Sequence, residues 1–164
     1  MKSLFMETST VTANRSRAEI HELLAQAGAR AIQYEYGDDQ RVVGVAFLLR
    51  ITGRDIPFLL PVRVQRVEAK IRERVRRPRR GWEERLHNDA ERIAWRQAFR
   101  WLQAQMAFID TGMVKSLEVF MPYAQTGPNQ TLYEKLEAEN FKMLPSPNNC
   151  SVSSESSVAE GRKP

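Results

Sequence analysis

The stretch DAERIAWRQAFRWLQAQMAFIDTGMVKSLEVFM, from Asp89 to Met121, is the longest periodic apolar segment of the chain. Its apolar residues recur at separations of three, four and one, which is the period of an α-helix and not the alternation of a strand. Trp95 and Trp101 widen the resulting stripe, so the segment predicts a long central helix buried beneath a sheet or other helices. The stripe consists of Ile93, Ala94, Ala98, Phe99, Leu102, Met106 and Ile109.

The ends of this central helix have recognisable signals. Asn88 and Asp89 both have side chains suited to an N-cap, so we expect the helix to begin there. Gly112 is suited to the position after the last turn, so we expect the helix to stop before it. We interpret its aromatic residues as core, while a platform that stacks nucleic-acid bases is an alternative use of the same rings.

Three segments before the central helix alternate apolar and polar residues as strands do. They run from Arg30 to Tyr36, from Arg41 to Ile51 and from Ile56 to Val62. Because short turns connect them, they predict a three-stranded antiparallel meander. Pro57 and Pro61 cannot donate to a ladder, which predicts that the third strand lies at an edge. One apolar face per strand indicates that helices cover only one side.

Both ends of the chain add helices. Ser16 and Glu19 match a capping box that begins an N-terminal helix, and Gly28 ends it. Val114 to Tyr123 has the apolar content of a short helix, and Thr131 is suited to cap a last one from Leu132 to Asn140. We expect residues 1–15 to be flexible, residues 16–144 to form a single domain and residues 145–164 to be disordered.

These segments together predict an α+β fold. It comprises an N-terminal helix, a three-stranded antiparallel meander, a basic helix, the long central helix and short C-terminal helices. The 164 residues suit one domain with a tail. The only cysteine, Cys150, excludes an intrachain disulfide and a cysteine-based zinc site. No apolar run is long enough to cross a membrane and no signal peptide is recognisable, so we expect a cytoplasmic protein without membrane partners.

Positive charge is concentrated between the strands and the central helix. The net charge is +5, yet the stretch from Arg63 to Arg80 has nine basic and two acidic residues, a local balance of +7 that leaves −2 elsewhere. Val64, Val67, Ile71 and Val75 form a narrow apolar seam at helical spacing, and Pro78 ends the pattern. We predict that the basic residues beside the seam contact nucleic-acid phosphates: Arg63, Arg66, Lys70, Arg74, Arg77, Arg79 and Arg80.

The same pattern has other interpretations. The basic face could be solvated and partly neutralised by pairs of Glu68 with Arg72 and of Glu73 with Arg77. The seam could instead be an oligomer or partner contact, with the arginines docking an acidic protein, so that the chain would be a protein-interaction module. Anionic lipid is disfavoured, because the seam is narrow and lacks aromatic residues.

Catalytic chemistry has little support. His87, Asp89 and Glu91 group an imidazole with two carboxylates, and a metal-dependent nuclease would need such groups around a divalent ion. Acidic residues are, however, also favoured at the predicted helix N-terminus by the helix dipole. The glycines are scattered and no nucleophile motif is present. We therefore predict no catalytic residue, no metal ligand and no cofactor.

Two sets of short motifs remain. One is Ser16-Arg17-Ala18-Glu19-Ile20 with Leu23-Leu24 and Gly28-Ala29; the other joins Ala90-Glu91-Arg92-Ile93-Ala94-Trp95-Arg96, Ala104-Gln105, Gly112-Met113, Met121-Pro122-Tyr123 and Thr131-Leu132-Tyr133-Glu134. Together they resemble a group of small uncharacterised proteins encoded by bacteriophages and prophages. The resemblance implies a bacterial or phage cytoplasm and work near replication, recombination or gene regulation. It implies no particular site residues.

Overall fold

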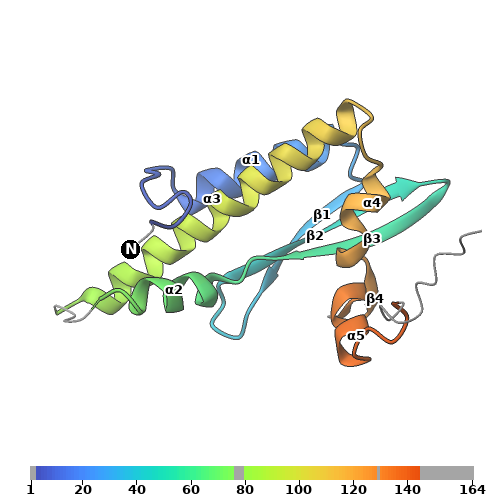
Figure 1. Cartoon of the computed structure of the whole chain (residues 1–164). Coiled ribbons are helices and arrows are strands. Elements are labelled where there is room, and N and C mark those ends of the chain that lie inside the picture. The colour runs from blue at the N-terminus through green and yellow to red at the C-terminus, as the bar shows by residue number, and fades with distance from the viewer. Residues whose placement is uncertain (1–2, 76–79, 129, 145–164) are drawn as a thin grey trace, which may run out of the picture.

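The computed structural model of the chain describes residues 3–75, 80–128 and 130–144 (Figure 1). The elements have the predicted α+β order, with short strands added near the C-terminal end. In chain order they are α1 (Ala13–Gln26), β1 (Ala31–Tyr36), β2 (Val42–Ile51), β3 (Arg54–Pro61), α2 (Val64–Arg72), α3 (Trp82–Asp110), α4 (Ser116–Phe120), the 3-10 turn η1 (Met121–Tyr123), β4 (Gln125–Gly127), β5 (Gln130–Thr131) and α5 (Leu132–Ala138).

The first three strands form the predicted antiparallel meander in the order β1-β2-β3. In one row across the sheet, Ile32 pairs with Phe47 and Phe47 pairs with Phe58. The edge position predicted for β3 from its prolines is confirmed. Helices α1 and α3 lie on the same side of the sheet, as predicted for the helices that the structure describes (Figure 1).

The core lies between this sheet face and the two helices. Alternate residues of β2 and β3 point into it, and Trp95 of α3 is fully buried at its centre. The Tyr34 ring meets the Trp95 ring edge-on, with 6.4 Å between centroids. Trp95 therefore offers no accessible face for base stacking, and its assignment to the core is confirmed. The buried set includes Ile20, Leu24, Val45, Phe47, Leu49, Phe58, Leu60, Phe99, Leu102 and Phe120.

Helix α3 begins at Trp82, so the predicted start at Asn88 or Asp89 is wrong. Its N-cap is Gly81, in the left-handed conformation at φ +73°, with no side-chain capping bond. The extra turns are held because Leu86 is buried and helices α2 and α3 pack together. The helix ends at Asp110, and Gly112 follows at φ +75°, as predicted.

Helix α1 also begins before its predicted start. The side chain of Thr12 accepts a hydrogen bond from the Arg15 backbone N–H at 3.2 Å, so Thr12 is the N-cap. Ser16 lies inside the helix and is fully buried, and the Glu19 carboxylate contacts Arg96 of α3. The capping box predicted at Ser16 is therefore wrong, and the boundary predicted at residue 16 falls within α1.

The C-terminal elements lie beside β3. Thr131 caps α5 as predicted, because its hydroxyl accepts from the Glu134 backbone N–H at 3.3 Å and its own N–H donates to the Glu134 carboxylate at 3.0 Å. Strands β4 and β5 follow η1, and Ala124 forms a bridge with Phe58 of β3. The predicted disordered tail, residues 145–164, lies outside the described residues. Among the described helices, none is long and apolar enough to span a bilayer.

Candidate nucleic-acid interface

Helix α2 packs against the first turns of α3. We refer to residues 63–92, of which residues 76–79 lie outside the described part of the chain, as the helical hairpin. It projects beyond the sheet at one end of the molecule (Figure 1). Of the apolar seam, Val64 is buried, while Val67 and Ile71 are half-buried against the core. The seam is thus used inside the molecule. A partner that docked on Val67 and Ile71 would have to displace this packing.

The predicted phosphate contacts do not share one helical stripe. Helix α2 ends at Arg72, so only Arg66 and Lys70 lie within it. Arg63 is at the N-cap position, and Arg74 comes two residues after the end of the helix. Arg80 immediately precedes the Gly81 cap of α3. The remaining two predicted contacts, Arg77 and Arg79, lie outside the described residues.

Several of these cations have carboxylate partners. Arg63 lies 3.7 Å from Glu134 of α5, and the Lys70 ammonium lies 2.9 Å from Glu73. Arg72 makes a forked contact with Glu83 of α3, at 2.7 and 3.0 Å, instead of the predicted pair with Glu68. The hydrogen bond to Glu83 raises the pKa of Arg72 above its ordinary value. All of these pairs are more than one-third exposed and so open to exchange.

Arg66 and Arg80 are the predicted contacts that are most available. Both are exposed, and neither pairs with a carboxylate of a described residue. Arg85, on the first turns of α3, is also exposed and donates to the backbone carbonyls of Arg80 and Gly81. Arg85 was missed in the sequence because the start of α3 was placed after it.

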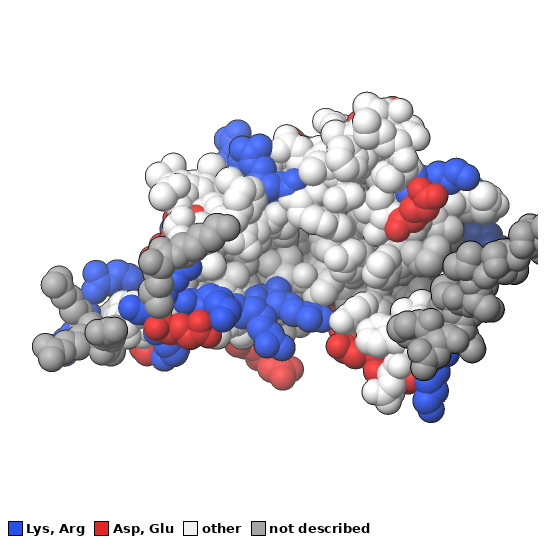
Figure 2. Space-filling model, in the orientation of Figure 1, with Lys and Arg blue, Asp and Glu red and all other residues white. Residues whose placement is uncertain are grey.

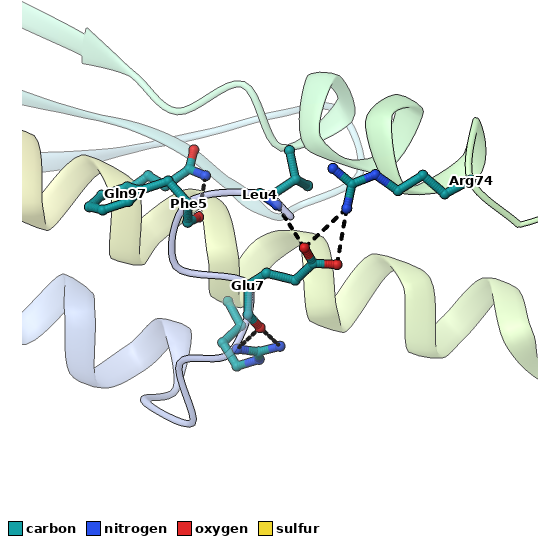
Figure 3. Close-up of polar contacts among 6 residues, drawn as sticks. Leu4, Phe5, Glu7, Arg74 and Gln97 are labelled. Atoms are coloured by element: carbon teal, nitrogen blue, oxygen red, sulfur yellow. Dashed lines mark hydrogen bonds and ion pairs between the residues drawn. The ribbon is translucent and has the colours of Figure 1, made fainter. Parts of the chain in front are cut away.

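Arg74 contacts the N-terminal segment, residues 3–12 (Figure 3). One Arg74 nitrogen donates to both carboxylate oxygens of Glu7, at 3.0 and 3.2 Å. The Leu4 backbone N–H donates to the same carboxylate at 2.7 Å, and this bond, followed by that of Arg74, holds the pKa of Glu7 below its usual range. Arg92 donates to the Glu7 carbonyl at 3.4 Å, and Gln97 donates to the Phe5 carbonyl at 2.7 Å.

The hairpin carries the net charge of the whole protein. Residues 63–92 contain eleven Lys and Arg against six Asp and Glu, a balance of +5, while the rest of the chain has fourteen of each sign. Figure 2 shows a blue band of basic side chains over α2, with acidic side chains along one border. Three of the arginines of the hairpin, Arg76, Arg77 and Arg79, lie outside the described residues, and the described part of the hairpin has eight basic and six acidic residues.

The grouping of His87, Asp89 and Glu91 is not preserved in three dimensions. His87 contacts Glu68 of α2, Asp89 lies 3.1 Å from Arg92, and Glu91 lies 2.8 Å from Arg17 of α1. Among the described residues, no three His, Cys, Asp or Glu side chains gather as a metal site. These three residues lie within α3 and not at its N-terminus, so their main contacts are with neighbouring side chains.

Comparisons of the chain with protein-family models, with curated proteins and with solved structures find no match. Function is therefore inferred from the residues of the helical hairpin alone.

Proposed function

We propose that the protein is a non-catalytic, phage-type accessory protein that binds nucleic acid through the helical hairpin. The observation that supports this most is the confinement of the whole net charge to residues 63–92. Arg66 and Arg80 supply guanidinium groups with no carboxylate partner among the described residues. Guanidinium groups bind phosphate oxygens through charge-assisted, often forked hydrogen bonds.

The paired cations add to this surface. The side chains of Arg63, Lys70 and Arg72 are each more than half exposed, although each has a carboxylate partner. Exposed ion pairs are weak because water competes for both charges, so a phosphate can replace the carboxylate at small cost. We therefore include these three groups in the binding surface.

Contacts of this kind favour the phosphate backbone over particular bases. Backbone contacts position a protein on nucleic acid but do not discriminate sequence, and they make the affinity strongly dependent on salt. Cations outnumber carboxylates among the exposed, described side chains of the hairpin, and its tryptophan, Trp82, is half-buried beneath the Arg72 guanidinium, 5.4 Å from it. We expect binding that depends little on sequence.

The test is a salt series of binding measurements with labelled single- and double-stranded DNA and RNA. Changing Arg66 and Arg80 together to Gln should weaken binding and should lower the slope of log affinity against log salt by about one for each lost contact. The matched control changes Arg41, which precedes β2, and Arg54, the first residue of β3; both are exposed, and the change removes the same charge.

Three results have distinct meanings. A loss confined to the hairpin variant supports the proposed surface. An equal loss in both variants shows that only the total charge matters and that the site assignment is wrong. No binding of the wild-type protein at low salt rejects the nucleic-acid function, and an acidic protein would then be the partner to seek for the same cations.

A further inference from the structure

The sheet has a second face, on the side opposite α1 and α3. Side chains alternate along each strand, so every second residue of β1, β2 and β3 lies on this open sheet face. The ladder register aligns these residues in rows that cross all three strands. The rows are Ala31–Leu48–Pro57, Gln33–Ala46–Leu59 and Glu35–Gly44–Pro61.

This face is unusually apolar. The outer face of an antiparallel sheet that is covered on one side is ordinarily polar. Here only Gln33 and Glu35 are polar among the nine residues of the three rows, and Leu48 and Leu59 lie in the middle of the face, half-buried but still accessible. Two shallow hollows open on these rows, one of them bordered by Gln125 of β4. An apolar patch of this kind, bordered by polar residues, can serve as a site of association.

The two ends of the open sheet face carry opposite charge. Glu35 lies in the last row at one end. At the other end Arg50 forks onto Asp55 at 2.8 and 3.0 Å, and Arg30 approaches the same carboxylate at 3.7 Å. Two guanidinium groups thus share one carboxylate, which leaves this end with a net charge of +1.

We propose that a second copy of this chain docks on the open sheet face. The two copies are related by a two-fold axis that lies between their sheets and runs perpendicular to the strands. This axis stacks β1 of one copy on β1 of the other in the opposite direction. Glu35 of each copy then meets Arg30 of its partner, and the rows centred on Leu48 and Ala46 cover one another. Such an interface is self-complementary and closed, as two-fold contacts are. The proposal is independent of the proposed nucleic-acid function.

A dimer formed by pairing of strand edges is less favourable than one formed by stacking of sheet faces. β1 is the free edge, and its ladder register shifts between Glu35 and Tyr36, an irregularity that disfavours the addition of another strand. At the opposite edge, Ala124 bridges Phe58 of β3. Stacking of faces, as in sheet-on-sheet packing, is therefore favoured over pairing of edges.

The dimensions of the face predict a weak dimer. Three strands spaced about 4.8 Å apart and three rows spaced about 6.7 Å apart give a patch of roughly 15 by 20 Å. This is smaller than the roughly 800 Å² per partner of a standard interface. We expect reversible association, with half of the protein dimeric at micromolar concentrations.

Sedimentation velocity of the full chain, from about 1 to about 200 μM, tests the proposal directly. The wild type should shift from monomer to dimer, and Leu59→Lys should raise the dissociation constant at least tenfold. The control is Phe108→Lys, because Phe108 is 48% exposed on α3, away from the open sheet face. It should dimerise like the wild type. Circular dichroism confirms that each variant is folded.

If Leu59→Lys does not fold, a series of charge reversals at Glu35 and Arg30 tests the same dimer. Glu35→Lys and Arg30→Glu should each weaken the dimer several-fold, and the double variant should restore it, because the charges meet across the axis. The proposal is overturned by a wild type that stays monomeric at 200 μM, by a dimer that Phe108→Lys and Leu59→Lys disrupt equally, or by charge reversals whose effects simply add.

Discussion

The sheet with its two long helices and the helical hairpin are held together by different forces. Between β2, β3, α1 and the middle of α3, fully buried side chains such as Trp95 and Phe58 make the contacts. In the described part of the hairpin only Val64, Leu86 and Ala90 are buried. Polar contacts also join its two helices, such as those of Arg72 with Glu83 and of His87 with Glu68.

This difference in contacts means that one region supplies most of the stability and the other supplies groups that can bind a ligand. Apolar burial stabilises a fold strongly, but the buried groups are no longer available to a ligand. Exposed charged contacts stabilise it little, and each group can exchange one partner for another. The hairpin can therefore change its partners while the sheet and the two helices remain packed.

The two tryptophans should give the largest contrast between these regions. Trp95→Ala removes a fully buried ring and should lower the free energy of unfolding by about 3–5 kcal/mol. Trp82→Ala removes a half-buried ring from the hairpin and should cost about 1 kcal/mol. Urea unfolding followed by circular dichroism measures both. Equal losses would contradict the division into a packed region and a charged one.

A second test uses two arginines that contact the same carboxylate, Glu19. The Arg96 side chain is 10% exposed, whereas that of Arg15 is 73% exposed. Arg96→Met leaves a partly buried carboxylate without its inner partner and should cost about 2 kcal/mol of unfolding free energy. Arg15→Met should change it by less than about 0.5 kcal/mol. A larger effect at Arg15 would show that burial does not decide the strength of these pairs.

A smaller effect is expected where the N-terminal segment meets the hairpin. Glu7→Gln removes one carboxylate partner of Arg74 and one negative charge beside the hairpin, so it should tighten nucleic-acid binding about threefold at low salt and steepen the salt dependence. The control is Glu139→Gln, which removes the same charge from an exposed position after α5. If both variants tighten binding equally, only the net charge matters. If wild type and variants all fail to bind, the proposed function itself is wrong.

The smallest expected effect is the pH dependence of the contact between Glu7 and Arg74. The pKa of Glu7 lies below its ordinary value of 4.5, so the contact with Arg74 is fully present above pH 4.5 and is lost as the pH falls through the lowered pKa. The Leu4 amide resonance should follow this transition, with a midpoint below 4.5. Arg74→Gln should move the midpoint upward. An unchanged midpoint would show that Arg74 does not hold the carboxylate.

Much of the sheet follows from the sequence because its signals are local. Alternation located all three strands to within two residues, and the prolines of β3 indicated its edge position. The starts of α1 and α3 were missed for different reasons. Thr12 caps α1 one turn before Ser16, which also matches a capping pattern. The first turns of α3 contain mainly charged residues and persist because Leu86 packs in the hairpin, a contact that is not visible in a local window.

The sequence shows where basic residues are concentrated, but it does not show how their side chains are arranged or paired. Counting cations between Arg63 and Arg80 locates the charge-dense segment, because charge density needs no knowledge of contacts. Their partners come from distant parts of the chain, namely Glu7, Glu83 and Glu134. Only tertiary structure brings such pairs together, so the sequence could not show which cations are neutralised.

The N-terminal segment has a consequence for the order in which the chain folds. The hairpin closes through contacts between residues 11 and 19 positions apart, such as those of Arg72 with Glu83 and His87 with Glu68. The N-terminal segment contacts partners that lie 67 to 92 positions later in the chain. Because local contacts form sooner than distant ones, the hairpin should fold first. Residues 3–12 are thus made before the hairpin but contact it only after it has folded, so Glu7 joins Arg74 late in folding.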